Sequence, residues 1–189
     1  MKKIVRGLVV AAIAAGILAG GCYAAGTSSK GKKTAKGHDK KAVAVLQSKS
    51  DSHVTGKAAF HEANGKVTLE VTLEGAEPGQ HAVHLHEKGD CTAPDGASAG
   101  GHWNPTHEDH GKWGTAPFHH GDIGVVEVGA DGKGKLELTT DLWTIGGAPE
   151  TDVIGKAVIV HAKTDDFTTQ PTGNAGGRVA CGVVEASKK

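Results

Sequence analysis

Aromatic side chains, cysteines and any excess of one charge are all scarce in this chain of 189 residues. It has three Phe, three Trp and one Tyr, so its core must be built mainly from Val, Leu, Ile and Ala. Almost no stretch has helical periodicity, and there is no repeat of the kind that marks a solenoid. Acidic and basic side chains number 21 each, which excludes the basic footprint of a nucleic-acid-binding protein.

The sequence also lacks an apolar run long enough for a comfortable membrane span. Residues 1–22 have a positive start, an apolar run from Leu8 to Leu18 and small residues before Cys22. This is the layout of a secretory signal, so we expect an exported protein of the periplasm or cell envelope. The small residues before Cys22 resemble a bacterial lipobox, in which that cysteine carries a membrane-anchoring lipid. The alternative is ordinary cleavage near Ala24 or Ala25.

The rest of the chain divides into a linker and one domain. Residues 23–41 are polar and rich in Gly, Ser and Lys, which predicts a flexible linker. Residues 42–189 have the length of a single domain. Without Cys22 the cysteines are Cys91 and Cys181, the even number typical of an oxidising compartment. They either remain free thiols or form one bridge, which would stabilise the fold by at most about 4–5 kcal/mol.

The sequence of this domain predicts a series of short strands separated by turns. In residues 66–73, Val67, Leu69, Val71 and Leu73 alternate with polar residues, which predicts a strand with one buried face. The predicted strands are 42–46, 54–61, 66–73, 81–87, 123–128, 135–139, 153–161 and 178–185. Eight short strands predict an all-β fold, an antiparallel Greek-key sandwich or barrel with long loops.

Histidines are concentrated between His81 and Asp122, a stretch that contains eight of the twelve. His84 and His86 lie in an alternating pattern, so both imidazoles should project from one face of a strand. After Lys88 the periodicity disappears, and so long a loop in a compact domain needs something to hold it in place. Metal ions could do this, and a disulfide through Cys91 is a second means.

Further residues of metal-ligating type follow this histidine pair. They are His102, His110, His119, Asp122 and His161. Ligation by nitrogen alone in a tetragonal arrangement suits Cu(II), whereas three His and one Asp suit tetrahedral Zn(II). The chain therefore has enough ligands for two metal sites. The alternative is a His-rich loop without a defined site.

Four motifs, in order, resemble the copper–zinc superoxide dismutase family. They are His84-Leu85-His86-Glu87, Gly101-His102-Trp103-Asn104-Pro105, His119-His120-Gly121-Asp122 and the run from Gly173 to Gly182. The likeness runs from about Ala42 to Glu185, and the loop from Cys91 to His102 is similar to the exported bacterial branch. The resemblance implies conversion of superoxide to dioxygen and hydrogen peroxide by alternating reduction and oxidation of a His-ligated copper, beside a structural zinc.

The resemblance also implies roles for individual residues. It implies copper ligation by His84, His86, His102 and His161, and zinc ligation by His102, His110, His119 and Asp122. His102 would bridge the two metals. Asp165 would link His84 and His110 by hydrogen bonds, Arg178 would be the active-site arginine that meets superoxide, and Cys91–Cys181 would be the family disulfide.

Several points stay open on the sequence alone. The segment from Asp165 to Arg178 lacks the Glu-Glu-Lys cluster of the animal cytosolic enzymes. Lys88, Lys112 or Lys163 would therefore have to steer the substrate, or steering is weaker. The chain could be a monomer or a homodimer. We expect His81, His107 and His120 not to be ligands. The main rival function is an exported copper- and zinc-binding protein on the same fold without turnover. A zinc hydrolase and a structural adhesion domain are less consistent with this ligand set.

Overall fold

The structure, a computed structural model, describes residues 39–188. The expected leader (1–22), Cys22 and nearly all of the expected linker (23–41) lie outside the described residues. In residues 39–188, no helix is long and apolar enough to cross a membrane. The described helical structure is one short 3₁₀ turn, Ala97–Ala99, so the all-β prediction is confirmed.

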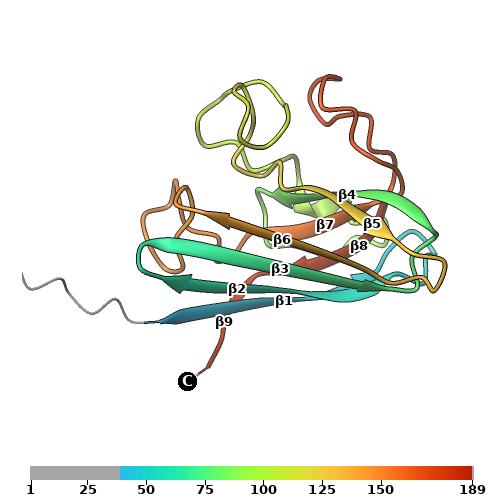
Figure 1. The fold of residues 1–189 in the computed structure, drawn as a ribbon, viewed down its shortest axis with the longest axis horizontal. Helices are drawn as coiled ribbons and strands as arrows, with labels where there is room; N and C mark the ends of the chain where they lie inside the picture. The colour runs from blue at the N-terminus through green and yellow to red at the C-terminus, as the bar shows by residue number, and fades with distance from the viewer. Residues whose placement is uncertain (1–38, 189) are drawn as a thin grey trace, which may run out of the picture. The chain divides into compact units, whose positions relative to one another are not determined.

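The strands form one antiparallel barrel (Figure 1). Their bounds are β1 (Lys40–Ser48), β2 (Thr55–Ala63), β3 (Lys66–Glu74), β4 (Gly79–His86), β5 (Gly124–Val128), β6 (Gly134–Thr140), β7 (Ala157–His161), β8 (Arg178–Val183) and β9 (Glu185–Ala186). Neighbours follow the order β2-β3-β6-β5-β4-β7-β8-β1, and pairing of β1 with β2 closes the ring. The connections from β3 to β4 and from β6 to β7 each cross over two strands, which is Greek-key topology.

The core is aliphatic, as the scarcity of aromatic residues predicts. On β3, Val67, Leu69, Val71 and Leu73 are buried and the residues between them are more exposed. Burying side chains of this size contributes about 1.5–3 kcal/mol each. The main aromatic contribution comes from Phe60 and Trp143, whose ring centroids lie 6.1 Å apart in the core.

One predicted strand, 153–161, begins too early. β7 begins only at Ala157, because residues 153–156 form a turn in which Gly155 has φ +73°. The Val153 N–H there donates to the Thr144 carbonyl (3.1 Å), so this apolar segment closes the preceding loop and does not extend the sheet. The structure also adds β9, which pairs with β1 and was not predicted as a separate strand.

Two long connections lie on the side of the barrel that carries the histidines. In Figure 1 the yellow-green connection from β4 to β5 and the orange-red connection from β7 to β8 both rise beyond β4 and β7. They cover residues 87–123 and 162–177. Ligand-type residues from distant parts of the sequence can therefore meet at this face.

Candidate metal centre

The site begins on β4, which carries His84 and His86. Both residues are fully buried (0 % exposed), because β4 pairs with β5 and β7 and the long loop covers its end. The Leu85 N–H donates to the Gly121 carbonyl, and the Leu85 carbonyl accepts from the Trp103 N–H, both at 2.8 Å. A backbone bridge then pairs His86 with His102, which brings His102 beside the strand.

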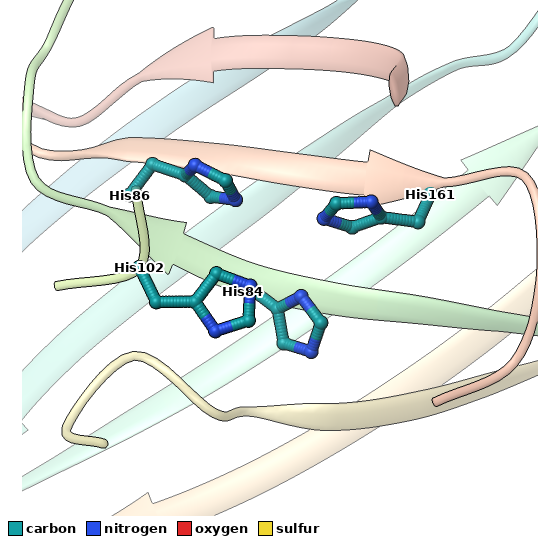
Figure 2. Close-up of side chains that lie close together, drawn as sticks. All are labelled: His84, His86, His102 and His161. Atoms are coloured by element: carbon teal, nitrogen blue, oxygen red, sulfur yellow. The ribbon is translucent and has the colours of Figure 1, made fainter. Parts of the chain in front are cut away.

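His161 completes a group of four rings. It ends β7, the neighbour of β4, where the register with β8 shifts between Val160 and His161. Figure 2 shows the rings of His84, His86, His102 and His161 gathered around one space. One nitrogen from each ring lies within 4.8 Å of the others, and all four residues are buried.

The hydrogen bonds of these rings determine which nitrogen faces that space. His84 donates from Nε2 to Asp165 Oδ2 (2.8 Å), His86 from Nδ1 to the Gly100 carbonyl (2.9 Å), and His161 from Nδ1 to the Gly176 carbonyl (3.2 Å). Such bonds fix the tautomer of each ring, so the lone pair of its other nitrogen points into the space between the four rings.

The nitrogens left over are buried and have no hydrogen-bond partner. They are His84 Nδ1, His86 Nε2, His102 Nε2 and His161 Nε2. A buried polar atom without a partner is expensive, at about 1–3 kcal/mol each. One metal ion would satisfy all four, and four imidazole nitrogens are a donor set that suits copper. These residues therefore fit a copper ion.

A second group shares His102 with the first. Its members are His102, His110, His119 and Asp122, all buried and again with ligand atoms within 4.8 Å. Asp122 Oδ1 lies 2.8 Å from His102 Nδ1, 3.0 Å from His110 Nδ1 and 3.3 Å from His119 Nδ1. Ligands of a tetrahedral zinc stand about 3.3–3.4 Å apart, given Zn–N distances of about 2.0–2.1 Å.

The directions of these atoms agree with a shared metal. His110 Nδ1 makes no hydrogen bond although Asp122 Oδ1 is 3.0 Å away, as expected when two ligand atoms point at a common centre. Asp122 Oδ2 accepts from the N–H groups of Gly111 (3.0 Å) and His119 (2.8 Å), which fixes the carboxylate. His119 donates from Nε2 to the Glu108 carbonyl (3.1 Å). This second group fits zinc.

Asp165 connects the two groups. Its Oδ2 accepts from His84 Nε2 (2.8 Å), and its Oδ1 accepts from His110 Nε2 (2.9 Å). The Phe167 N–H also donates to Oδ1 (2.7 Å). Asp165 is buried, so one carboxylate orients a ring of each group.

Arg178 lies at the first residue of β8. Its guanidinium donates from Nη1 to the Gly96 carbonyl and from Nη2 to the Gly100 carbonyl, both at 2.7 Å. The Gly100 carbonyl also accepts from His86 Nδ1. One oxygen therefore connects Arg178 to the four-nitrogen group, which is the set of His84, His86, His102 and His161. Burial lowers the pKa of Arg178, but a guanidinium stays charged at any physiological pH. It offers a permanent positive charge beside the site.

Burial keeps three rings of this group, those of His86, His102 and His161, unprotonated in the metal-free chain. Burial lowers the pKa of His161 to about 3 and that of His102 to about 4, and it holds the pKa of His86 well below its usual value. Burial alone would lower the pKa of His110 as well, but the neighbouring carboxylates of Asp122 and Asp165 outweigh burial and raise that pKa to about 9. The rings of His86, His102 and His161 are therefore neutral and ready to ligate at pH 7.

Cys91 and Cys181 form a disulfide with a Cα–Cα distance of 5.8 Å, so the bridge alternative is confirmed. It joins the long loop to β8, close to Arg178. Lys49, the residue directly after β1, donates from Nζ to the Cys91 carbonyl (2.5 Å) and attaches the loop at a second point. The loop carbonyls that hold Arg178 are thus attached to the barrel.

The other histidines stay outside both groups among residues 39–188. The ring nitrogens of His81 lie 2.9 Å from the His161 carbonyl and 2.8 Å from the Glu77 carbonyl, which suits a supporting role beneath β7. His107 is exposed, and the ring of His120 stands edge-on to Trp103 at 5.6 Å.

Two contributors to the site have no recognisable signature in the sequence. One is the Gly100 carbonyl, which joins Arg178 to His86. The other is Gln170, whose side-chain amide bonds to the backbone of His110. A backbone oxygen has no residue signature, and an exposed glutamine resembles any other polar loop residue.

Comparisons with known proteins agree with this geometry. Residues 54–184 match the family model described as copper/zinc superoxide dismutase. A superoxide dismutase [Cu-Zn] of Caulobacter vibrioides is 40 % identical over 149 residues, covering 76 % of this chain and 85 % of the relative. That of Deinococcus radiodurans is 37 % identical over 145 residues, covering 70 % and 78 %.

A solved structure is also similar. The crystal structure of the clock protein EA4 superposes with a TM-score of 0.68 at 38 % identity, covering 76 % of this chain and 92 % of that one. Sequence and structure comparisons thus agree with the two ligand groups. The chain belongs to the copper/zinc superoxide dismutase family, and it is an oxidoreductase that converts superoxide with copper and zinc as cofactors.

Proposed function

We propose that His84, His86, His102 and His161 bind the copper, that His102, His110, His119 and Asp122 bind the zinc, and that Asp165 and Arg178 support them. The observation that carries this assignment is the set of four buried nitrogens without hydrogen-bond partners. Because His102 contributes to both groups, the two metals would share one ring. The rival, a metal-binding protein without turnover, is not favoured, since no member of either group is missing.

Each residue then has a task in dismutation. Bound copper supplies the one-electron chemistry that redox-silent zinc cannot. Arg178 attracts and orients superoxide, because its charged fork is held rigidly by two carbonyl oxygens. His102 Nδ1 lies 2.8 Å from Asp122 Oδ1 in the zinc-type group, so His102 Nε2 is the atom that would bind copper or, when it does not bind copper, would hold a proton. Asp165 holds the rings of His84 and His110 in place.

A superoxide assay on metal-replete protein tests this proposal. The wild type should consume superoxide, and His102→Ala or His161→Ala should lower the rate by at least about 100-fold, since each removes a metal ligand. His53→Ala changes an exposed histidine outside both groups and is the matched control. If copper- and zinc-loaded wild type consumes superoxide no faster than free copper, the assignment fails.

We further propose that residues 1–22 direct export to the periplasm or cell envelope and that Cys22 carries a lipid anchor, with residues 23–41 as the linker to the domain. The residues before Cys22 and the even number of cysteines in the rest of the chain support this proposal. Mass spectrometry of the N-terminus of the mature protein decides it. A diacylglycerol mass on Cys22 is expected, and cleavage near Ala24 or Ala25 would contradict the anchor.

The anchored protein would act as a monomer or a homodimer that contacts the membrane only through its lipid. Light scattering of the domain without its lipid distinguishes the two states. A mass that is higher than a dimer at micromolar concentration would contradict both.

A further inference from the structure

The backbone of His110 has no backbone partner in the described chain. His110 lies in an irregular part of the long loop, and no main-chain hydrogen bond of residues 39–188 uses its N–H or its carbonyl. His110 itself is only 2 % exposed. Buried main-chain groups need partners, so something else must satisfy them.

One side chain supplies both partners. Gln170 Oε1 accepts from the His110 N–H (2.8 Å), and Gln170 Nε2 donates to the His110 carbonyl (2.9 Å). The amide thus bonds to His110 as a neighbouring strand would. Because one atom must accept and the other donate, these two bonds also fix the orientation of the amide.

The turn before Gln170 determines where this amide lies. Asp166 Oδ1 accepts from the N–H groups of Thr168 (3.0 Å) and Thr169 (2.8 Å), and its Oδ2 accepts from the Thr169 hydroxyl (2.6 Å). These bonds close a compact turn between Asp165 and Gln170. Asp165 consequently reaches the ring of His110 while Gln170 reaches its backbone.

We propose that Gln170 is a positioning residue for His110, and that its amide increases the affinity of the zinc site. This inference rests on the proposed role of His110 as a zinc ligand. Asp165 alone leaves the His110 backbone free to shift, and metal sites weaken when supporting contacts loosen. With both contacts, ring and backbone are held from one turn of the loop that connects β7 to β8.

The test compares Gln170→Met with Gln80→Met. Methionine keeps the length of glutamine but loses both hydrogen bonds to His110. Gln80 is exposed and contacts the same loop through the Thr164 hydroxyl (3.2 Å), so its variant removes a loop contact that does not involve His110. We expect zinc affinity, measured by competition with a chromophoric chelator, to fall about tenfold in Gln170→Met and to stay at the wild-type value in Gln80→Met.

Hydrogen exchange of zinc-loaded protein shows whether the effect acts through the backbone. The His110 amide should exchange at least about tenfold faster in Gln170→Met, because its acceptor is gone. Faster exchange with unchanged zinc affinity would show that the contact exists but does not position the ligand. Weaker zinc binding with unchanged exchange would show an effect that bypasses the His110 backbone. Either result overturns the inference.

His110→Ala separates this inference from the proposed function. If His110→Ala leaves zinc affinity unchanged, the ligand assignment itself is wrong. If His110→Ala weakens zinc binding and Gln170→Met does not, only the role of Gln170 is wrong.

Discussion

Gly173 occupies a position where a larger residue would collide with the supporting carboxylate. It has φ +66°, and a Cβ there would overlap Asp165 Oδ1 and come within 2.6 Å of His110 Nε2. Gly173→Ala should therefore displace Asp165 and add backbone strain of about 1–3 kcal/mol. We expect a lower thermal midpoint and weaker zinc binding, measured by calorimetry and chelator competition.

Gly177→Ala is the matched control for that substitution. Gly177 lies near the end of the same loop, and no atom lies within 4 Å of a Cβ built there. Its stability and zinc affinity should stay close to those of the wild type. If both alanine variants behave alike, the close approach of Gly173 to Asp165 is not what matters.

Side-chain chemistry could be predicted from the sequence at the scale of single residues, but supporting backbone contacts could not. His84 and His86 stood out because their spacing places two imidazoles on one face of a strand. Gln170 did not, because its role depends on contact with a residue 60 positions away. The Gly100 carbonyl was undetectable for a similar reason, since any residue carries the same oxygen.

The disulfide matters for the long loop as a whole. It closes a loop of 90 residues and fixes the segment whose Gly96 and Gly100 carbonyls hold Arg178. Replacing both Cys91 and Cys181 with Ser should cost up to about 4–5 kcal/mol, which lowers the melting temperature by on the order of 10 °C. Activity at 25 °C should fall as well, because Arg178 loses its fixed partners.

The control for the disulfide variant is Thr92→Val, which removes a hydroxyl bond to Asp90 (2.7 Å) in the same loop and keeps the bridge. Thermal unfolding of both variants at equal metal content gives the comparison. A double serine variant that melts within 2–3 °C of the wild type, a shift worth only about 1 kcal/mol, would show that the loop is held mainly by its metals.

At the scale of elements, the alternation of apolar and polar residues predicted well those strands that bury one face and expose the other. The strand 66–73 is the clearest case, and β3 matches it to within one residue. The run 153–161 misled because apolar residues lie on both sides of Gly155 and Lys156, and an apolar stretch does not reveal whether it pairs in a sheet or closes a loop. The pairing of β1 with β8 also had no local signal, since the two strands lie at opposite ends of the domain sequence.

For the whole molecule, the buried histidines predict an acid-sensitive metal-free state. The pKa of His161 is about 3 and that of His102 about 4, against about 6.5 in an unfolded chain. Between pH 6.5 and 4 the unfolded chain therefore binds more protons, so stability falls as pH falls. His110 acts oppositely: its pKa of about 9 gives stability that is complete below pH 6.5 and is lost as pH rises through 9.

Urea unfolding of chelator-treated protein between pH 4 and 9 measures this dependence. We expect greatest stability near pH 6.5–7 and a steep loss toward pH 4. His161→Gln should reduce the acid slope by about one proton, because one group no longer titrates between the two states. Stability that is flat from pH 6.5 to 4 in the wild type would contradict this account.

Electrostatic steering is the last property that belongs to the whole molecule. Superoxide is an anion, so its encounter rate with a site beside Arg178 should fall as ionic strength rises. Of the lysines considered, Lys163 packs its side chain against Gly176, since a Cβ built on Gly176 would lie 3.2–3.7 Å from carbons of the Lys163 side chain. The Gly176 carbonyl in turn accepts a hydrogen bond from His161. Lys88 instead lies 3.9 Å from Glu87 Oε1, which offsets its charge.

Lys163→Gln should therefore lower kcat/KM about twofold to threefold at low salt and flatten its salt dependence, while Lys88→Gln should change little. Stopped-flow superoxide decay across a salt series measures both, and equal effects of the two substitutions would mean that steering does not depend on proximity to the copper ligands.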